Sequence, residues 1–141
     1  MSGLYQHLYA RPFLRSRVEG IPAPKGSKKL INGRLIEASP RLTWWNHQLD
    51  EQLHEDYTTS CATEIRPVHI ELTFRMPKPK TRKVGIWHEK RPDVDKLARA
   101  VLDALTRSGV IADDSQVASL YVCKRYDSDL PDGVDIEGWI L

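Results

Sequence analysis

Four aspartates are the residues of this sequence whose types and spacing point most directly to chemistry. Asp93 and Asp95 stand at the expected start of a helix, and Asp113 and Asp114 stand on the turn that follows it. Clustered carboxylates repel one another, and a hard divalent cation such as Mg²⁺ or Mn²⁺ relieves that repulsion through its oxygen ligands. Such an ion can polarise a phosphoryl oxygen and lower the pKa of a bound water for in-line attack. The four acids therefore suggest a metal site for phosphoryl chemistry.

The two acidic pairs can share one ion only if the chain returns to the start of the helix. A helix of about 14 residues is about 21 Å long. We expect the segment 109–115 to run back along the helix and bring Asp114 close to Asp93. Each acid also has a structural alternative, because an aspartate at a helix start can cap the helix or favour its dipole, and an aspartate pair can form a turn.

The charge distribution along the chain is uneven although the net charge is only +2. Residues 11–34 contain seven basic residues and one acid, and residues 75–99 contain nine basic residues and three acids. The remaining segments 35–74 and 100–141 are acidic. Two basic blocks favour a surface for a polyphosphate, although such blocks are also found in solvated loops. Acids that hold a metal, surrounded by cations that hold a backbone, suit a phosphodiester substrate.

Local patterns predict a single domain of the α/β (α+β) class, with a mixed sheet and two main helices. We expect an N-terminal arm at 1–15 and one domain at 16–141. Alternating apolar residues indicate strands, apolar residues at helical spacing indicate helices, and Asn32-Gly33 indicates a hairpin turn. The expected order is β-β-β-α-β-α-β-β, over 17–21, the hairpin 28–37, 39–57, 68–74, 94–108, 117–126 and 134–141.

Several classes of protein are excluded by the composition. A chain of 141 residues can bury one ordinary core without disulfides or structural metals. No apolar run is long enough to span a membrane, and the first residues lack a secretory pattern, so we expect a cytoplasmic protein. Cys61 and Cys123 are expected to be two buried thiols.

Two stretches of the chain resemble a known family. Residues 91–105 read Arg-Pro-Asp-Val-Asp-Lys-Leu-Ala-Arg-Ala-Val-Leu-Asp-Ala-Leu, and residues 109–117 read Gly-Val-Ile-Ala-Asp-Asp-Ser-Gln-Val. Together they resemble the central motif of the RusA-like endodeoxyribonucleases, Holliday junction resolvases often carried by phages and prophages. Residues 22–26, Pro-Ala-Pro-Lys-Gly, are similar in a weaker way to the family's N-terminal proline and lysine motif.

The resemblance implies a homodimeric nuclease that binds four-way DNA junctions and makes paired, Mg²⁺-dependent nicks during recombination and repair. Its setting would be the cytoplasm of a bacterial or phage-infected cell, without a membrane or a small-molecule cofactor. Asp93 and Asp95 correspond to the family's two helix-start acids and Asp114 to its third essential carboxylate, with Asp113 beside it as a further metal ligand. The family's essential lysine falls at Arg99 in this sequence.

The arginine at position 99 leaves alternatives open. It keeps the positive charge that stabilises phosphoryl oxygens, but it cannot donate its proton as a lysine can. It could also pair with Asp95 or Asp103 on the helix surface. Lys96 is a candidate substitute. The alternative functions are a junction-binding module without cleavage and a flap or RNA nuclease on the same scaffold. We expect the DNA backbone to contact Lys25, Lys78, Lys80, Arg82, Lys83 and Lys96.

For three histidines and for Trp87, a structural role is preferred to a functional one. His47, His54 and His69 are expected at the surface, since none has a partner at metal-ligand spacing. Trp87 lies in the long basic loop, where it could stack on an unpaired base, but an anchor that fixes the loop to the core is the preferred interpretation.

Overall fold

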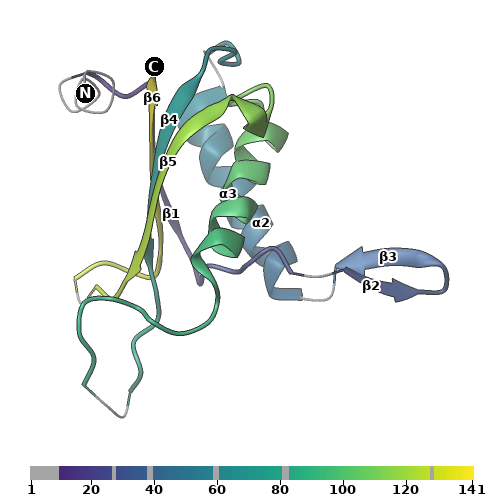
Figure 1. The fold of residues 1–141 in the computed structure, drawn as a ribbon, viewed down its shortest axis with the longest axis vertical. Coiled ribbons are helices and arrows are strands. Elements are labelled where there is room, and N and C mark those ends of the chain that lie inside the picture. The colour runs from purple at the N-terminus through teal and green to yellow at the C-terminus, as the bar shows by residue number, and fades with distance from the viewer. Residues whose placement is uncertain (1–9, 27, 38–39, 59–60, 81–82, 128) are drawn as a thin grey trace.

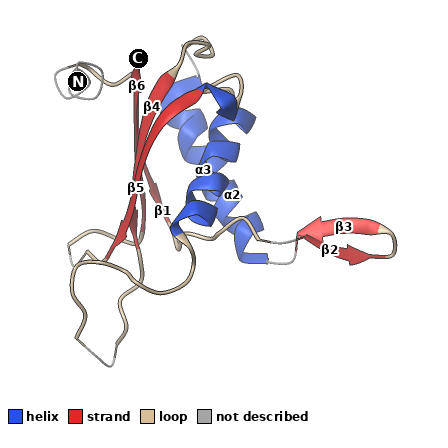
Figure 2. Cartoon of the chain, in the orientation of Figure 1, coloured by secondary structure: helices blue, strands red, loops and turns tan. Residues whose placement is uncertain are grey.

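The computed structural model describes residues 10–26, 28–37, 40–58, 61–80, 83–127 and 129–141. Its elements follow the order predicted from the sequence and confirm the α+β class (Figure 2). The π-helical turn η1 (His54–Thr58) extends the first described helix, and the 3₁₀ turn η2 (Asp114–Gln116) precedes the fifth strand. The main elements are β1 (Leu14–Glu19), β2 (Lys28–Ile31), β3 (Arg34–Glu37), α2 (Pro40–Leu53), β4 (Val68–Arg75), α3 (Val94–Arg107), β5 (Val117–Arg125) and β6 (Gly133–Ile140).

Four strands form one mixed sheet in the order β1-β6-β4-β5. β6 runs antiparallel to both of its neighbours, whereas β4 and β5 run parallel, with Val68 paired to Val117 and Arg75 paired to Arg125. Parallel neighbours start at the same edge of a sheet, so the chain must cross back between them. Helix α3 makes that crossover, and α2 and α3 cover the same face of the sheet (Figure 1).

The core lies between this sheet and the two helices. In β4, Ile70, Leu72 and Phe74 are fully buried at every second position, as alternation predicts. Helix α3 adds an apolar stripe, and α2 adds Trp45, whereas the neighbouring Trp44 is exposed. The buried residues of α3 are Leu97, Ala98, Ala100, Val101, Ala104 and Leu105.

The predicted hairpin is present as β2 and β3, and it projects away from the body of the domain (Figure 1). Asn32 and Gly33 have φ values of 51° and 75°. A two-residue turn of type I′ requires positive φ at both central positions, which asparagine and glycine tolerate best. The Asn32-Gly33 pair therefore fixes the register of the hairpin. The predicted capping residue Ser39 lies outside the described residues.

The first strand, the two cysteines and His69 differ from the expectations drawn from the sequence. β1 begins at Leu14, so the last residues of the expected arm belong to the sheet and its core. Cys61 is exposed and Cys123 is half-buried, so the thiols are not both buried as expected. His69 is buried rather than at the surface, because Ser119 and Glu71 contact its ring nitrogens at 2.8 and 3.1 Å and the Trp139 ring lies 5.8 Å away.

His47 and His54 are exposed, as expected. Within the described residues, no helix is both long enough and apolar enough to cross a membrane.

Truncation of Leu97 tests the position assigned to α3. Leu97 is fully buried against the sheet, so Leu97→Ala removes apolar contacts and leaves a cavity. The free energy of unfolding, measured by urea titration, should fall by about 2–5 kcal/mol. Arg99→Ala, on the exposed side of the same helix, should change it by less than about 0.5 kcal/mol. Equal losses in the two variants would show that the helix is oriented differently.

Candidate active site

The start of α3 presents two exposed carboxylates, Asp93 and Asp95. Asp93 occupies the N-cap position of α3, but its side chain makes no capping hydrogen bond. It lies 3.7 Å from the ammonium of Lys96 and is exposed, and Asp95 is exposed in the first turn. A capping role would have occupied the Asp93 oxygens, so the missing cap hydrogen bond argues against the structural alternative.

Lys124, which was not predicted from the sequence, holds the chain at this helix start. Its ammonium donates hydrogen bonds to the carbonyl oxygen of Pro92, at 2.7 Å, and to that of Lys90. Burial lowers the pKa of Lys124, and the nearby Asp93 carboxylate partly opposes that shift. Lys124 therefore positions Asp93 from the neighbouring strand. Only the register of β5 against the loop reveals this contact, so no local sequence pattern could have indicated it.

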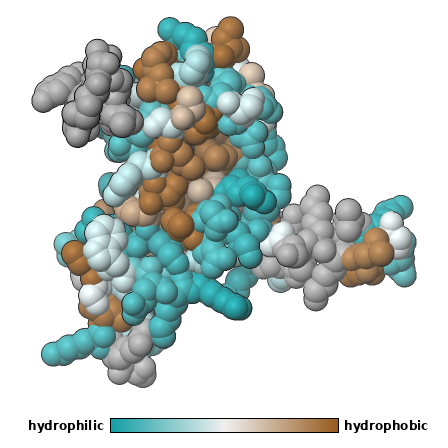
Figure 3. All heavy atoms as spheres, in the orientation of Figure 1, coloured by the Kyte–Doolittle hydropathy of each residue, from teal (hydrophilic) through white to brown (hydrophobic). Residues whose placement is uncertain are grey.

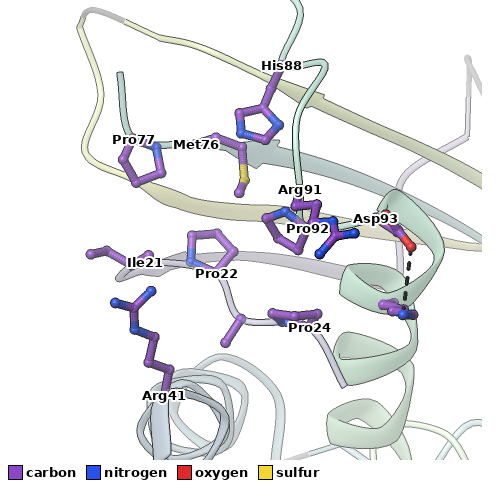
Figure 4. Close-up of a pocket in the computed structure, with 12 residues that line it drawn as sticks. Ile21, Pro22, Pro24, Arg41, Met76, Pro77, His88, Arg91, Pro92 and Asp93 are labelled. Carbon is purple, nitrogen blue, oxygen red and sulfur yellow. Dashed lines mark ion pairs between the residues drawn. The ribbon is translucent and has the colours of Figure 1, made fainter. Parts of the chain in front are cut away.

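A hollow of about 730 Å³ lies beside Asp93. Its apolar wall comes from the segment after β1 and from the end of β4, and cationic side chains border it. Arg41 of α2 and Arg91 of the loop before α3 extend toward it from different elements (Figure 4). Cations around an apolar hollow suit a nucleotide, which carries both a phosphate and a base. The apolar wall includes Ile21, Pro22, Ala23, Pro24, Met76 and Pro77.

The second acidic pair lies on the turn before β5, and its two members differ. Asp113 is a capping residue: its carboxylate accepts a hydrogen bond from the Ser115 amide at 2.9 Å, while Gln116 Oε1 accepts one from the Asp113 amide. The hydrogen bond from Ser115 lowers the pKa of Asp113. Asp114 is exposed, and its carboxylate makes no hydrogen bond or ion pair with the described residues. The Asp114 carboxylate is therefore less engaged in local structure than that of Asp113.

The two acidic pairs lie at opposite ends of the domain in one chain. Asp93 adjoins Lys124 near the end of β5, whereas Asp114 lies just before Val117 at its start. The seven residue steps from Val117 to Lys124 correspond to about 23 Å of extended strand. The expected return of segment 109–115 to the helix start does not occur, because η2 leads directly into β5. Accordingly, no three His, Cys, Asp or Glu side chains of the described residues form a metal cluster.

The predicted cations are distributed unevenly around the helix start. Arg99 is exposed one helical turn after Asp95, and it forms no ion pair with a described residue. Lys25 is engaged, because its ammonium contacts Asp103 at 2.6 Å, so Asp103 has the structural role preferred for it but with a different partner. Three further predicted contacts, Lys78, Lys80 and Lys83, are exposed in the loop between β4 and α3, and Arg82 lies outside the described residues.

The donor set at the helix start fits a hard divalent cation. Asp93 and Asp95 offer carboxylate oxygens, which Mg²⁺ and Mn²⁺ prefer, and neither carboxylate accepts a hydrogen bond within the part of the chain that the structure describes. Mg²⁺ usually retains several waters and binds only one or two carboxylates together with substrate phosphates. The cation-rich hollow beside Asp93 lies where such phosphates could approach.

Exposed carboxylates at a helix start with cations around them suit chemistry on a phosphodiester, and comparison with known proteins agrees. Residues 20–137 match the family model described as endodeoxyribonuclease RusA. The chain is also 30% identical over 103 residues to a crossover junction endodeoxyribonuclease of Lactococcus phage r1t, which covers 73% of this chain and 77% of the relative. The chain therefore belongs to the RusA endodeoxyribonuclease family, as the motif in 91–117 indicated.

Glu64 contacts the turn that holds Asp114 through its main-chain carbonyl, and its carboxylate is a titratable group beside that turn. The Glu64 carbonyl accepts a hydrogen bond from the Gln116 side chain at 2.9 Å, and its carboxylate accepts one from Arg66 Nε at 2.9 Å. The hydrogen bond from Arg66 lowers the pKa of Glu64 to about 2. Because the unfolded value is about 4.3, the carboxylate stabilises the fold above that pH, and this contribution is lost as the pH falls toward 2.

We expect Glu64→Gln to lower the free energy of unfolding most at pH 6, and the difference from the parent protein to shrink between pH 5 and pH 2. Urea titrations across this range measure it. Glu55→Gln is the matched control, since Glu55 is exposed and forms no hydrogen bond or ion pair with the described residues. A difference that does not vary with pH would mean that the ionised Glu64 carboxylate does not stabilise the fold.

Proposed function

We propose that this protein is a Holliday junction resolvase that nicks four-way DNA junctions in a divalent-metal-dependent reaction. The observation on which this proposal rests is the membership of residues 20–137 in the RusA family, combined with a helix start where Asp93 and Asp95 are free to bind an ion. The phage relative supports a junction substrate and action in a bacterial or phage-infected cell. Recombination and repair are the processes that require such an activity.

Different side chains would bind the metal, stabilise the developing charge and hold the DNA backbone. Asp93, Asp95 and Asp114 would hold Mg²⁺, with Asp113 beside them, and the ion would supply Lewis acidity toward the phosphoryl oxygens and activate a water. Arg99 stabilises the negative charge that develops on those oxygens. Lys96 neutralises Asp93 until the site is loaded, and the loop lysines hold the DNA backbone.

A homodimer is proposed because a single chain separates the acids. β5 is an edge strand of the sheet, and its outer side is unpaired between Val117 and Cys123 within the described residues. Leu120 and Tyr121 are 43% and 54% exposed on this edge. An apolar band runs over β5 and the adjoining side of α3, where Leu102 and Val122 are only partly buried (Figure 3). An unpaired apolar edge strand is a template for pairing with another chain.

Pairing of this edge with a second copy about a two-fold axis would place the two β5 strands antiparallel. The start of each β5 then lies opposite the end of the other, and the partner's Asp114 approaches Asp93 and Asp95. Two complete acidic sites form, one at each end of the paired strands. A four-way junction has two strands to cut, so two sites related by symmetry match the substrate.

Replacement of one carboxylate tests the nuclease assignment. Asp93→Asn keeps the size of the side chain but removes the charge that would hold the metal. Nicking of a labelled four-way junction in Mg²⁺ should fall by about 10²-fold or more, while binding of the junction persists. Glu89→Gln, which alters an exposed acid of the preceding loop, should cut normally. Binding without nicks by the parent protein in both Mg²⁺ and Mn²⁺ would establish the junction-binding alternative, and equal cutting of flap or RNA substrates would overturn the substrate assignment.

Mixed dimers test whether each site is shared between two chains. Asp93→Asn and Asp114→Asn proteins, each inactive alone, are refolded together so that mixed dimers form. One of the two sites in a mixed dimer then contains only parental carboxylates, and single nicks should reappear in an assay on a closed-circular cruciform. Sites contained within one chain would leave both halves defective, so no recovery would refute the shared site.

A further inference from the structure

Trp87 is the most exposed aromatic side chain near the helix start. It is 60% exposed, and the preceding Ile86 is 57% exposed. The preferred interpretation from the sequence, that Trp87 anchors the loop to the core, is therefore wrong. Large apolar side chains that are exposed to water in this way commonly belong to a binding surface.

The main chain around Trp87 is held firmly in place. His88 donates a backbone hydrogen bond to Lys124 at 3.1 Å, and the Tyr126 amide donates one to Ile86 at 2.8 Å. The His88 ring packs on the Tyr126 ring with centroids 5.3 Å apart. The loop is thus anchored by His88 and by its backbone, so Trp87 is not needed for that purpose. Its side chain is presented outward from a fixed position.

Trp87 also lies among groups that suit nucleic acid. His88 and Arg91 line the hollow that contains Asp93, and Lys83 and Lys90 are exposed on the same loop. Basic residues outnumber acids in the segment 77–91, whose one acidic residue is Glu89. Aromatic side chains set among cations are the usual platform for unpaired bases, because the cations bind the backbone while the ring stacks on the base.

We propose that Trp87 stacks on a base left unpaired where the strands exchange, and so positions the strand to be cut against Asp93. This inference rests on the proposed junction substrate and adds the residue that recognises the branch point. In a continuous duplex both faces of each base are covered by neighbouring pairs, so the ring finds a partner only at a branch. Trp87 would therefore contribute selectivity for the junction over duplex DNA rather than general affinity.

The alternative role for Trp87 is to pack in the dimer interface. The segment 86–88 pairs with the end of β5, and in the proposed dimer it would adjoin the partner chain. The two roles differ in what the substitution changes. Loss of an interface residue lowers dimer affinity without DNA, whereas loss of a stacking residue lowers junction affinity while the dimer is unaffected.

The experiment compares Trp87→Ala and Trp87→Phe in the Asp93→Asn protein, which binds without cutting. Affinities for a synthetic four-way junction and for the matching duplex are measured by fluorescence anisotropy, and dimerisation by analytical ultracentrifugation. Trp44→Ala is the control, because Trp44 is 53% exposed on α2. We expect Trp87→Ala to lose about 10- to 100-fold for the junction, with duplex affinity and dimerisation unchanged, and Trp87→Phe to retain most of the affinity.

Photocrosslinking tests the contact between Trp87 and the base directly. Junctions with 5-iodouracil at the exchange point, irradiated in the complex, should crosslink to the peptide that contains Trp87, and duplexes with the same base should not. An unchanged junction affinity in Trp87→Ala, crosslinks elsewhere, or a weakened dimer would each overturn the stacking role. Failure of the proposed function is a separate result, because the Asp93→Asn protein with Trp87 intact would then show no preference for the junction over the duplex.

Discussion

The parallel pairing of β4 with β5 is the constraint on which the position of the functional groups depends. It requires α3 to run back along the sheet between the two strands. The motif that is continuous in 91–117 is thereby divided between two ends of the domain. The end that receives Asp93 also receives the basic loop, because that loop starts where β4 stops. The other end keeps Asp114 on a turn fixed through Gln116.

Features of the fold that depend on near neighbours were predictable. The Asn32-Gly33 turn, the alternation of β4 and the apolar stripe of α3 each follow from the conformations and faces available to a few consecutive residues. The burial of His69 was not predictable in this way. It depends on Ser119 and Trp139, which are brought beside it only by the pairing of β4 with β5 and β6.

The candidate site also has features that depend on near neighbours and features that depend on long-range pairing. The free Asp93 carboxylate follows from the helix start, which the apolar stripe of α3 locates. Its distance from Asp114 could not be predicted, because spacing along a helix does not fix the direction of the chain beyond it. Lys124 and the exposed Trp87 are likewise set by how the loop pairs with the end of β5. Residue types indicated the chemistry, and long-range pairing determined its geometry.

The opposite edge of the sheet has a different character, with consequences for the size of the assembly. On β1, Arg15 and Arg17 alternate along the strand and form ion pairs with Glu137 and Asp135 of β6. A charged edge resists the addition of further strands. Pairing through β5 would therefore join two sheets into one continuous sheet whose outer margins are both charged. These charged margins would disfavour the addition of a third sheet, so the proposed pairing through β5 would end at two chains.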